Sequence, residues 1–348
     1  MSVEITDVGA TSFAEHTTLR VGGPVARWIV ARSEEACIEA LVECDDIGAP
    51  VVVVGGGSNI VCSDDPFNGT VVQVAPTGVS IEDRGGHLRV IAAAGEDWDD
   101  FVMRTLEAGT GALAPLSGIP GLVGATPIQN VGAYGAEVSD FVTLVRVWDR
   151  RQREVLELSD EQCEFGYRTS ALKSDPDRYV VLEVVFDLPL DPVVVIDYAQ
   201  LADHLAVGVG ETADGRHVRA SVLALRRAKG MVLDDHDRDT WSVGSFFVNP
   251  VLADDQARTL PQQCPTFDAE RGVKVSAAWL IEHSGIERGF SLPGSGARIS
   301  TKHTLAICNA GSATSDDVLG LAREVRDRVR QRFGVVLSVE PRLIGCEL

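Results

Sequence analysis

The sequence lacks the features that mark several common classes of protein. No apolar run is long enough to span a membrane, and the first ten residues, MSVEITDVGA, contain neither a basic nor an apolar segment of a secretory signal. We therefore expect a cytoplasmic protein. Basic residues are scarce, with 31 lysines and arginines against 51 aspartates and glutamates, which gives a net charge of −20. Such a charge argues against nucleic acid or an anionic membrane as partner, because both would repel the protein.

Patterns for metals, disulfides and dinucleotides are missing as well. The seven cysteines are scattered without any C-x-x-C spacing, and the seven histidines form no H-E-x-x-H motif. We expect neither metal nor disulfides, and we interpret the cysteines as reduced thiols in the core. The stretch Gly208–Ala213 fits a degenerate dinucleotide fingerprint. Asp214 and Gly215 then give a turn signal where that fold needs a helix, so we predict a loop.

The chain does have the length and composition of a globular protein, with 348 residues, 45% of them hydrophobic and 24% charged. Residues 26–59 predict a strand, a helix capped by Ser33, a strand of valines and the glycine turn GGGSN. This turn follows a strand, the place where α/β proteins bind ligands, although a plain strand-ending turn is equally compatible.

Further elements follow along the chain. Helices are expected from Asp97 to Gly109, over the segment VKVSAAWLIEHSG, and from a cap at Ser315 to a stop at Gly334. The segments HLRVIAAA and TLVRVWDR, and the final VVLSVEPRLIG, are predicted as strands.

The run SGIPGLVGATPIQNVGAYG, from Ser117 to Gly135, carries the strongest functional signal. It holds five glycines and two prolines in nineteen residues and no charged residue, so it suits neither a regular element nor a solvated linker. The N–H groups of such a backbone can point into one concavity and bind the phosphates of a nucleotide without any cation. A buried irregular turn is the alternative.

Three polar residues stand in unusual local settings. Ser245 lies between a glycine and two phenylalanines in GSFFVNP, so its hydroxyl could be held in place to donate a proton to a strongly basic carbon. No G-x-S-x-G motif supports a serine hydrolase. Arg168 in FGYRTS and Glu340 in VEP could serve a site, but each could also be ordinary surface charge, and Ser245 could simply cap a turn.

Taken in order, eight motifs closely resemble those of the UDP-N-acetylenolpyruvoylglucosamine reductase (MurB) family over nearly the whole chain. They are TTLRVGGP, GGGSN, AGEDWDDFV, SGIPGLVGATPIQNVGAYG, FGYRTS, GSFFVNP, AAWLIEHSG and VEPRLIG. The resemblance implies an α+β protein with an FAD-binding fold of the vanillyl-alcohol-oxidase (PCMH) type and a C-terminal α+β substrate-binding domain. It implies a first FAD-binding subdomain over 1–70 completed by a C-terminal strand over 335–348, a second over 71–190, and the substrate domain over 191–334.

The resemblance also assigns a cofactor site for non-covalent FAD. The residues that match FAD-binding positions are Gly55, Gly56, Gly57, Ser58, Asn59, Ile60, Ser117, Gly118, Ile119, Gly121, Gly124, Gln129, Asn130, Gly132, Ala133, Tyr134, Gly135 and Arg342.

The implied reaction belongs to peptidoglycan precursor synthesis. NADPH would reduce FAD, and UDP-N-acetylglucosamine enolpyruvate would then accept a hydride from flavin N5 at C3 to give UDP-N-acetylmuramate. Ser245 matches the residue that protonates C2, and Arg168 and Glu340 match residues that stabilise the enolic intermediate.

Substrate contacts follow from the type I form of the family. Tyr198, Lys229 and Asn249 match its substrate-binding residues. Val248 departs from the pattern, because many relatives have lysine in GSFFKNP, and its loss removes one cation near an anionic substrate. We expect a monomer whose small-molecule partners are this substrate and NADPH.

Two alternatives stay open. One is a flavin oxidase of the same fold that uses oxygen, which the motifs around Ser245 and Glu340 disfavour. The other is a nucleotide-sugar sensor that has kept the fold and lost turnover, because fold alone does not prove activity.

Overall fold

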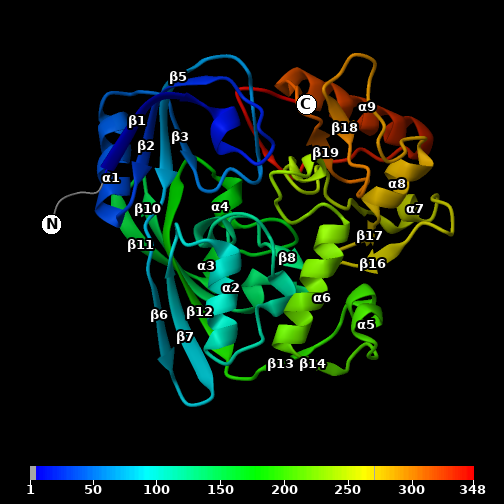
Figure 1. The fold of residues 1–348 in the computed structure, drawn as a ribbon, viewed down its shortest axis with the longest axis horizontal. Coiled ribbons are helices and arrows are strands. Elements are labelled where there is room, and N and C mark those ends of the chain that lie inside the picture. Colours follow the sequence, from blue (N-terminus) through cyan, green and yellow to red (C-terminus); the bar gives the residue numbers. More distant parts are fainter. Residues whose placement is uncertain (1–4, 270) are drawn as a thin grey trace. The chain divides into compact units, whose positions relative to one another are not determined.

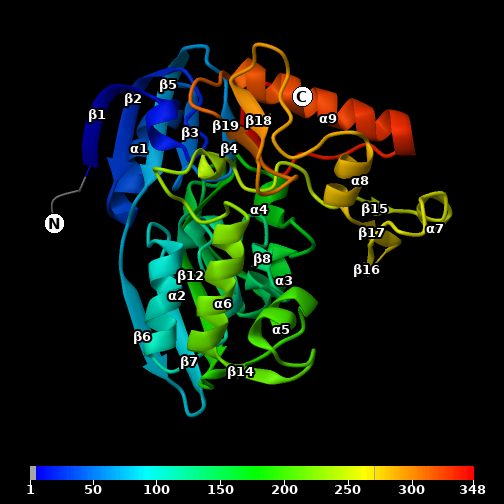
Figure 2. The same ribbon diagram turned by 45° about the vertical axis from the view of Figure 1, so that its right-hand side comes forward.

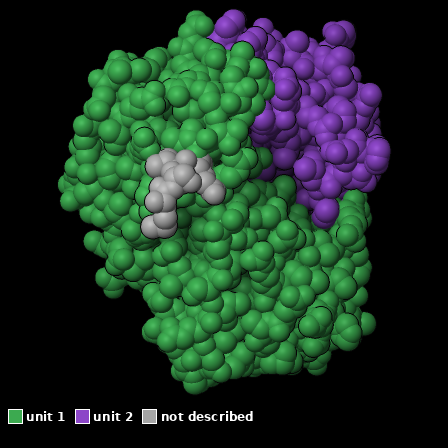
Figure 3. Space-filling model, turned by 60° about the vertical axis from the view of Figure 1, so that its left-hand side comes forward, with its two compact units in different colours: residues 1–11, 25–56, 68–228 green, residues 12–24, 57–67, 229–348 purple. Residues whose placement is uncertain are grey.

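The computed structural model of the protein describes residues 5–269 and 271–348. Contacts divide the chain into two compact units, coloured separately in Figure 3. Unit 1 comprises the chain up to residue 11 together with 25–56 and 68–228, and unit 2 comprises 12–24, 57–67 and 229–348. The three-part division expected from the sequence, with boundaries at residues 70, 190 and 334, stays a prediction.

The first sheet of unit 1 confirms the predicted strand–helix–strand–turn pattern. Its strand order is β1-β2-β5-β3, with β3 and β5 parallel. The backbone N–H of Ala36 donates to the Ser33 hydroxyl at 3.1 Å, so Ser33 is the cap of α1, as expected. The elements are β1 (Ile5–Ser12), β2 (Pro24–Ala31), α1 (Glu34–Asp46), β3 (Val51–Val54) and β5 (Phe67–Val74).

The second sheet of unit 1 is antiparallel, in the order β11-β10-β12-β7-β6 (Figure 1). Helix α2 packs on it through Trp98 and Phe101, whose rings lie 6.3 and 5.1 Å from that of Phe186 in β12. The bounds are β6 (Val79–Asp83), β7 (His87–Ala93), α2 (Trp98–Glu107), β10 (Val142–Asp149), β11 (Glu154–Ser159) and β12 (Tyr179–Pro189). The predicted helix from Asp97 and the two predicted strands are therefore confirmed.

Helix α6 and several short elements complete unit 1. They are η2 (Ala114–Leu116), η3 (Val123–Ala125), β8 (Gly132–Ala133), β9 (Ala136–Glu137), η4 (Val138–Asp140), α3 (Asp160–Cys163), α4 (Ala171–Ser174), β13 (Val193–Val195), α5 (Ala199–Leu205), β14 (Thr212–Asp214) and α6 (Gly215–Ala228). The predicted loop at 208–213 is partly wrong. Thr212–Asp214 pair with β13, and Asp214 accepts a hydrogen bond from Arg216 N at 2.9 Å, so this aspartate starts a helix instead of a turn.

Unit 2 has its own hydrophobic core, built around α8 and α9. Its C-terminal strand β20 pairs in parallel with β4, with Arg342 opposite Ile60. The elements are η1 (Phe13–His16), β4 (Ile60–Cys62), η5 (Arg238–Thr240), β15 (Val251–Leu252), α7 (Asp254–Ala257), β16 (Thr266–Asp268), β17 (Val273–Val275), α8 (Ala277–His283), β18 (Ala297–Ile299), β19 (Ile307–Asn309), α9 (Ser315–Phe333) and β20 (Arg342–Ile344).

Three sequence predictions in unit 2 need correction. The segment VKVSAAWLIEHSG begins as strand β17 and becomes helical only at Ala277, after the Ser276 cap. Thr314 caps α9, because the Ser315 hydroxyl bonds to Asp64 instead, at 3.0 Å. The final strand is short, since Pro341 has no N–H to donate and interrupts the pairing before Arg342. The stop of α9 at Gly334, with φ of 69°, is confirmed.

The cysteines are unpaired thiols, and all but the half-buried Cys346 are buried, which confirms the expected core thiols. Burial raises the pKa of Cys37 and Cys308 to about 12, so both are unreactive near neutral pH. Across the described ranges, no helix combines the length and apolarity that crossing a bilayer requires.

Candidate active site

The glycine loop from Ser117 to Gly135 lies in unit 1, beside the end of β7 and the start of α2. Two backbone bonds attach it there: Gly124 N donates to the carbonyl of Ala94, just after β7, at 2.9 Å, and Trp98 N, at the start of α2, donates to Gly121 O at 3.0 Å. Gly118, Gly121 and Gly135 have φ values of 69°, 127° and 89°, which favour glycine strongly. The composition of the loop therefore reflects backbone conformations that most other residues would strain to adopt.

The turn at Gly55 and Gly56 lies against this loop within unit 1. A Cβ atom at Gly56 would lie 3.2 Å from the Gly121 Cα, and one at Gly55 would lie 3.5 Å from the Leu122 side chain. The two glycine segments singled out in the sequence therefore meet backbone to backbone, although they are far apart along the chain.

The GGGSN turn also fits the phosphates of a nucleotide. Throughout residues 5–269 and 271–348, no protein acceptor takes the backbone N–H groups of Gly55, Gly56, Gly57 or Ser58. Gly57, with φ of 63°, gives this row of donors a sharp bend. Successive unpaired N–H groups in such a turn form an anion-binding nest, so the residues present fit the diphosphate of FAD.

Several predicted cofactor residues have structural roles in the loop. The Ser117 hydroxyl donates to Ala114 O at 2.7 Å, and a Cβ at Gly124 would lie 2.4 Å from the Ala94 Cβ. Gly132 and Ala133 form β8, which pairs with β9. Ile119, Gln129 and Tyr134 are half-buried. Any contact of these residues with FAD stays a prediction.

Asn130 ties the loop to the neighbouring FGYRTS turn. Its buried side chain donates to Glu137 Oε2 at 2.7 Å and to Gly166 O at 3.2 Å, and it accepts from Ser139 N at 3.0 Å. The side-chain amide of Asn130 is thus hydrogen-bonded to other parts of the protein. Asn130 positions the backbone that Arg168 contacts.

Arg168 is fixed against the same loop. It has φ of 56°, in the tight turn that Gly166 and Thr169 close. Its Nη2 donates to Gly132 O at 2.6 Å and its Nη1 donates to Asn130 O at 3.3 Å. The structure therefore brings together the Arg168 guanidinium and the predicted cofactor loop. The sequence pointed to this proximity only through the family resemblance, and the catalytic role of Arg168 stays a prediction.

Ser245 and Glu340 are brought together in unit 2 by backbone pairing. Glu340 N donates to Phe246 O at 2.9 Å, Phe247 bridges to Val339, and Val248 N donates to Ser338 O at 3.1 Å. Phe246 and Phe247 are fully buried, whereas Ser245 and Glu340 are half-buried. The phenylalanines thus anchor the segment and leave the two polar residues near the surface of the unit.

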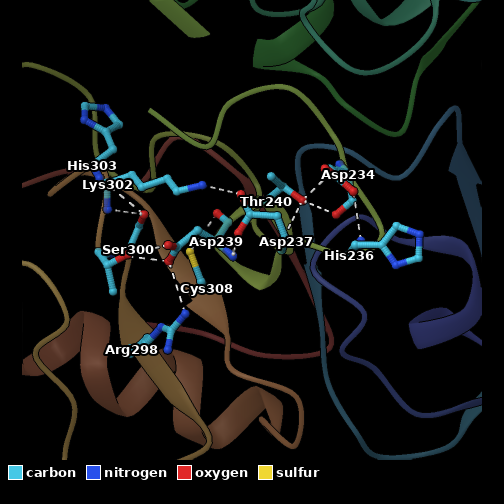
Figure 4. Close-up of polar contacts among 11 residues, drawn as sticks. Asp234, His236, Asp237, Asp239, Thr240, Arg298, Ser300, Lys302, His303 and Cys308 are labelled. Carbon is cyan, nitrogen blue, oxygen red and sulfur yellow. Dashed lines mark hydrogen bonds and ion pairs between the residues drawn. The ribbon is translucent and has the colours of Figure 1, made fainter. Parts of the chain in front are cut away.

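The segment before Ser245 is held by a polar network, drawn in Figure 4. Asp239 accepts from Thr301 N at 3.0 Å and from Arg298 Nη2 at 3.3 Å. The Thr240 hydroxyl donates to Asp237 O at 2.7 Å, and Lys302 pairs with Asp237. Burial alone would raise the pKa of Asp239, but the bonds from Thr301 and the charge of Arg298 lower it. Sequence analysis did not identify this network.

Arg342, Asn249 and Lys229, which the sequence also singled out, lie in unit 2. Arg342 pairs with Ile60, and its N–H donates to Asn59 O at 3.0 Å, beside the GGGSN turn. Asn249 Oδ1 accepts from Ala277 N at 2.9 Å at the start of α8. Lys229 follows α6 and is half-buried.

Tyr198 lies against the end of the glycine loop. It precedes α5, and its ring is edge-on to that of Tyr134 at 5.4 Å. Burial raises the pKa of Tyr134, so its hydroxyl stays protonated near neutral pH. The exposed Tyr198 and the half-buried Tyr134 come from parts of unit 1 that the sequence did not connect.

Comparison with known proteins shows which family this chain resembles. Residues 235–344 match the model described as the C-terminal domain of UDP-N-acetylenolpyruvoylglucosamine reductase, and residues 25–159 match an FAD binding domain. The chain is 48% identical to the reductase of Cutibacterium acnes, over 95% of this chain and 89% of that protein. It is also 48% identical to the reductase of Mycobacterium avium, over 97% and 95%.

A solved structure supports the fold. The crystal structure of UDP-N-acetylenolpyruvylglucosamine reductase from Thermus caldophilus superposes with a TM-score of 0.65 at 23% identity, covering 99% of this chain and all of that one. Together with the FAD binding domain match, this confirms the expected α+β FAD-binding fold.

Proposed function

The chain belongs to the UDP-N-acetylenolpyruvoylglucosamine reductase family, and from this premise we propose how its residues carry out an NADPH-dependent reduction. It is a flavin-dependent oxidoreductase with FAD as cofactor, as expected from the sequence. The proposal concerns the source of electrons, the route of the proton and the role of each site residue.

The overall reaction adds a hydride and a proton across the enolpyruvyl double bond of UDP-N-acetylglucosamine enolpyruvate. Bound FAD would be held by the GGGSN turn and the glycine loop, and it would supply the hydride for C3 of the enolpyruvyl group, with NADPH as the proposed source of the electrons. The electron pair of the double bond moves toward C2 and the carboxylate, and a proton at C2 completes UDP-N-acetylmuramate. The chain must therefore hold the cofactor, stabilise an enolate and deliver one proton.

The cofactor is proposed to be held by backbone. The N–H groups of Gly55 to Ser58 bind its diphosphate, and the loop from Ser117 to Gly135 encloses the rest. A backbone cradle suits a protein with a net charge of −20, because it binds an anion without recruiting lysine or arginine.

Ser245 is proposed to donate the proton to C2. A serine hydroxyl is a very weak acid, so it protonates only a strongly basic carbon, such as that of an enolate formed beside it. The observation that carries this assignment is the pairing of the Ser245 and Glu340 segments, which places the two half-buried polar residues on neighbouring backbone above fully buried phenylalanines.

Arg168 and Glu340 are proposed to stabilise the enolate. Arg168 is preorganised by its two bonds to loop carbonyls, so little reorganisation is needed as negative charge develops. An ionised Glu340 would oppose that charge, so we propose that Glu340 is either protonated or polarises the group beside it through a hydrogen bond.

Tyr198, Lys229 and Asn249 are proposed to contact the sugar nucleotide. Lys229 would pair with its diphosphate, and the exposed Tyr198 ring would cover it. The family resemblance implies lysine at the position of Val248, so this chain lacks that cation, and Lys229 is the proposed cation for the diphosphate.

The test follows the visible spectrum of the anaerobic protein during addition of NADPH and then of the enolpyruvyl substrate. NADPH should bleach the flavin in the wild type and in Ser245→Ala, and the substrate should restore the colour rapidly in the wild type alone. The variant should recover about 10²- to 10⁴-fold more slowly.

Ser338→Ala is the matched control, because this exposed serine lies on the segment paired with Val248 and its role there is carried by its backbone carbonyl. It should recover like the wild type. Recovery of Ser245→Ala at the control rate would overturn the proton assignment, and failure of NADPH to bleach the wild type would overturn the proposed electron donor.

A further inference from the structure

Gly118, at the start of the glycine loop, is bound by side chains at both of its backbone polar groups. Its N–H donates to Asp99 Oδ1 at 2.6 Å, and its carbonyl accepts from Arg226 Nε at 3.1 Å. Gly118 is buried and has φ of 69°. The two bonds therefore hold the peptide groups on either side of the Gly118 Cα, close to the end of η2.

Asp99 is itself held by a second arginine. Arg219 Nη1 and Nη2 reach the two carboxylate oxygens at 2.5 and 2.7 Å, and only 14% of the Arg219 side chain is exposed. A bidentate, largely buried pair of this kind fixes orientation as well as charge, unlike an exposed ion pair. Burial alone would raise the pKa of Asp99, but the bonds from Arg219 and Gly118 lower it, so the carboxylate is ionised near neutral pH.

Both arginines come from one helix. Arg219 and Arg226 are two turns apart in α6 and lie on the same face. Figure 2 shows α6 beside α2, the helix that carries Asp99, and the Arg219–Asp99 pair joins the two helices. The start of α6 is fixed by a close backbone approach, since a Cβ at Gly215 would lie 2.8 Å from the Gly111 Cα just before η2.

We propose that Asp99, Arg219 and Arg226 form a clamp on the backbone of Gly118 that positions the glycine loop for FAD, with Asp99 and Arg219 as positioning residues that do not touch the cofactor. The inference rests on the proposed role of the loop in holding FAD. It adds a determinant of cofactor affinity that lies in two helices outside the glycine motifs. Removal of the clamp leaves the loop free to adopt other conformations, and FAD binding must then order it again.

The chain offers a matched control in the same unit. Arg178 donates from Nε and Nη2 to Asp149 at 2.9 and 2.7 Å, another close Arg–Asp pair. Asp149 accepts from Arg151 N and Gln152 N in its own turn and makes no bond to the glycine loop in the described chain. Loss of this pair tests what an arginine–aspartate bond contributes to stability alone.

The experiment titrates the full-length apoprotein with FAD, follows flavin fluorescence, and measures the flavin reduction potential of the reconstituted protein. Arg219→Gln should raise the FAD dissociation constant about tenfold and shift the potential. Arg219→Lys should give an FAD dissociation constant between those of the wild type and Arg219→Gln, because lysine keeps the positive charge but cannot make the bidentate bond to Asp99. Arg178→Gln should leave both quantities at wild-type values.

Two further variants keep the outcomes distinct. Gly56→Val fills the space beside Gly121 and should weaken FAD binding by itself; if it does not, the proposed cofactor loop fails. If Gly56→Val weakens binding while Arg219→Gln matches Arg178→Gln, the loop holds FAD and the clamp is refuted. Should Arg219→Gln not fold, Asp99→Asn replaces it, since it keeps an oxygen for Gly118 N–H and loses the charge that orients Arg219.

Discussion

The two groups of proposed active-site residues are positioned by different means. The glycine loop and Arg168 in unit 1 are oriented by side chains that bond to backbone: Asp99 and Arg226 to Gly118, and Arg168 to Asn130 and Gly132. Ser245 and Glu340 in unit 2 are oriented by backbone pairing, with phenylalanines buried beneath.

This difference in how the two groups are positioned predicts which substitutions each group tolerates. A loop held by charged side chains should respond to single polar substitutions with changes in cofactor binding. A segment held by backbone bonds and a core should tolerate polar changes nearby and respond to loss of apolar volume. Substitutions of each kind in each unit therefore test the comparison.

The largest expected effect is on unit 2, from Phe247→Ala. Phe247 is fully buried and packs against Phe246 at 5.2 Å between ring centroids. Its truncation should lower the free energy of unfolding by about 3–5 kcal/mol, measured by urea denaturation, and should lower kcat because the bridge to Val339 loosens. The exposed Phe267→Ala is the control for deletion of a phenyl ring in the same unit. Equal losses of stability in the two variants would contradict core anchoring of the Ser245 segment.

Arg168→Ala should have the next largest effect, on turnover. Loss of a preorganised donor to the enolate should reduce kcat about 10²- to 10³-fold, as the loss of an oxyanion donor does. Because Arg168 also bonds to two loop carbonyls, the FAD dissociation constant should rise in the same variant. Steady-state kinetics and FAD titration measure the two effects separately. A fall in kcat with unchanged FAD affinity would show that the loop does not depend on this side chain.

Local signals in the sequence were sufficient for many elements of the fold. Ser33 before a charged, amphipathic stretch located α1, and Gly334 located the end of α9. The glycine-rich composition of residues 117–135 signalled an irregular loop whose φ values the structure shows. These signals are local, since a cap or a positive φ depends on a few adjacent residues.

The contacts that support the site could not be predicted in this way. Asp99 and Arg219 are 120 positions apart, and each reads alone as a charged residue on a helix surface. Asp239 likewise meets Thr301, 62 positions away. A charged residue reveals its partner only when the fold brings the two together, although the seven-residue spacing of Arg219 and Arg226 on one helix face was a usable signal.

The smallest expected effect, on unit 2, comes from Asp239→Asn and depends on pH. The Asp239 side chain is only 5% exposed and its pKa is lowered in the folded protein. In the unfolded chain the Asp239 carboxyl has a pKa of about 3.9, so it binds a proton more readily there than in the folded protein. The ionised carboxyl therefore stabilises the fold fully above pH 4, and this stabilisation is lost as the pH falls through the lowered pKa of the folded protein. Asp239→Asn should cost about 1 kcal/mol at pH 7, and the difference from the wild type should shrink on acidification. Urea denaturation from pH 7 down to pH 3 measures this, with exposed Asp65→Asn as the baseline for loss of one surface charge. If the difference in unfolding free energy between wild type and variant grew toward low pH, the pKa shift would have the opposite sign. An unchanged kcat of Asp239→Asn at pH 7 would agree with a Ser245 segment that is held mainly by its backbone.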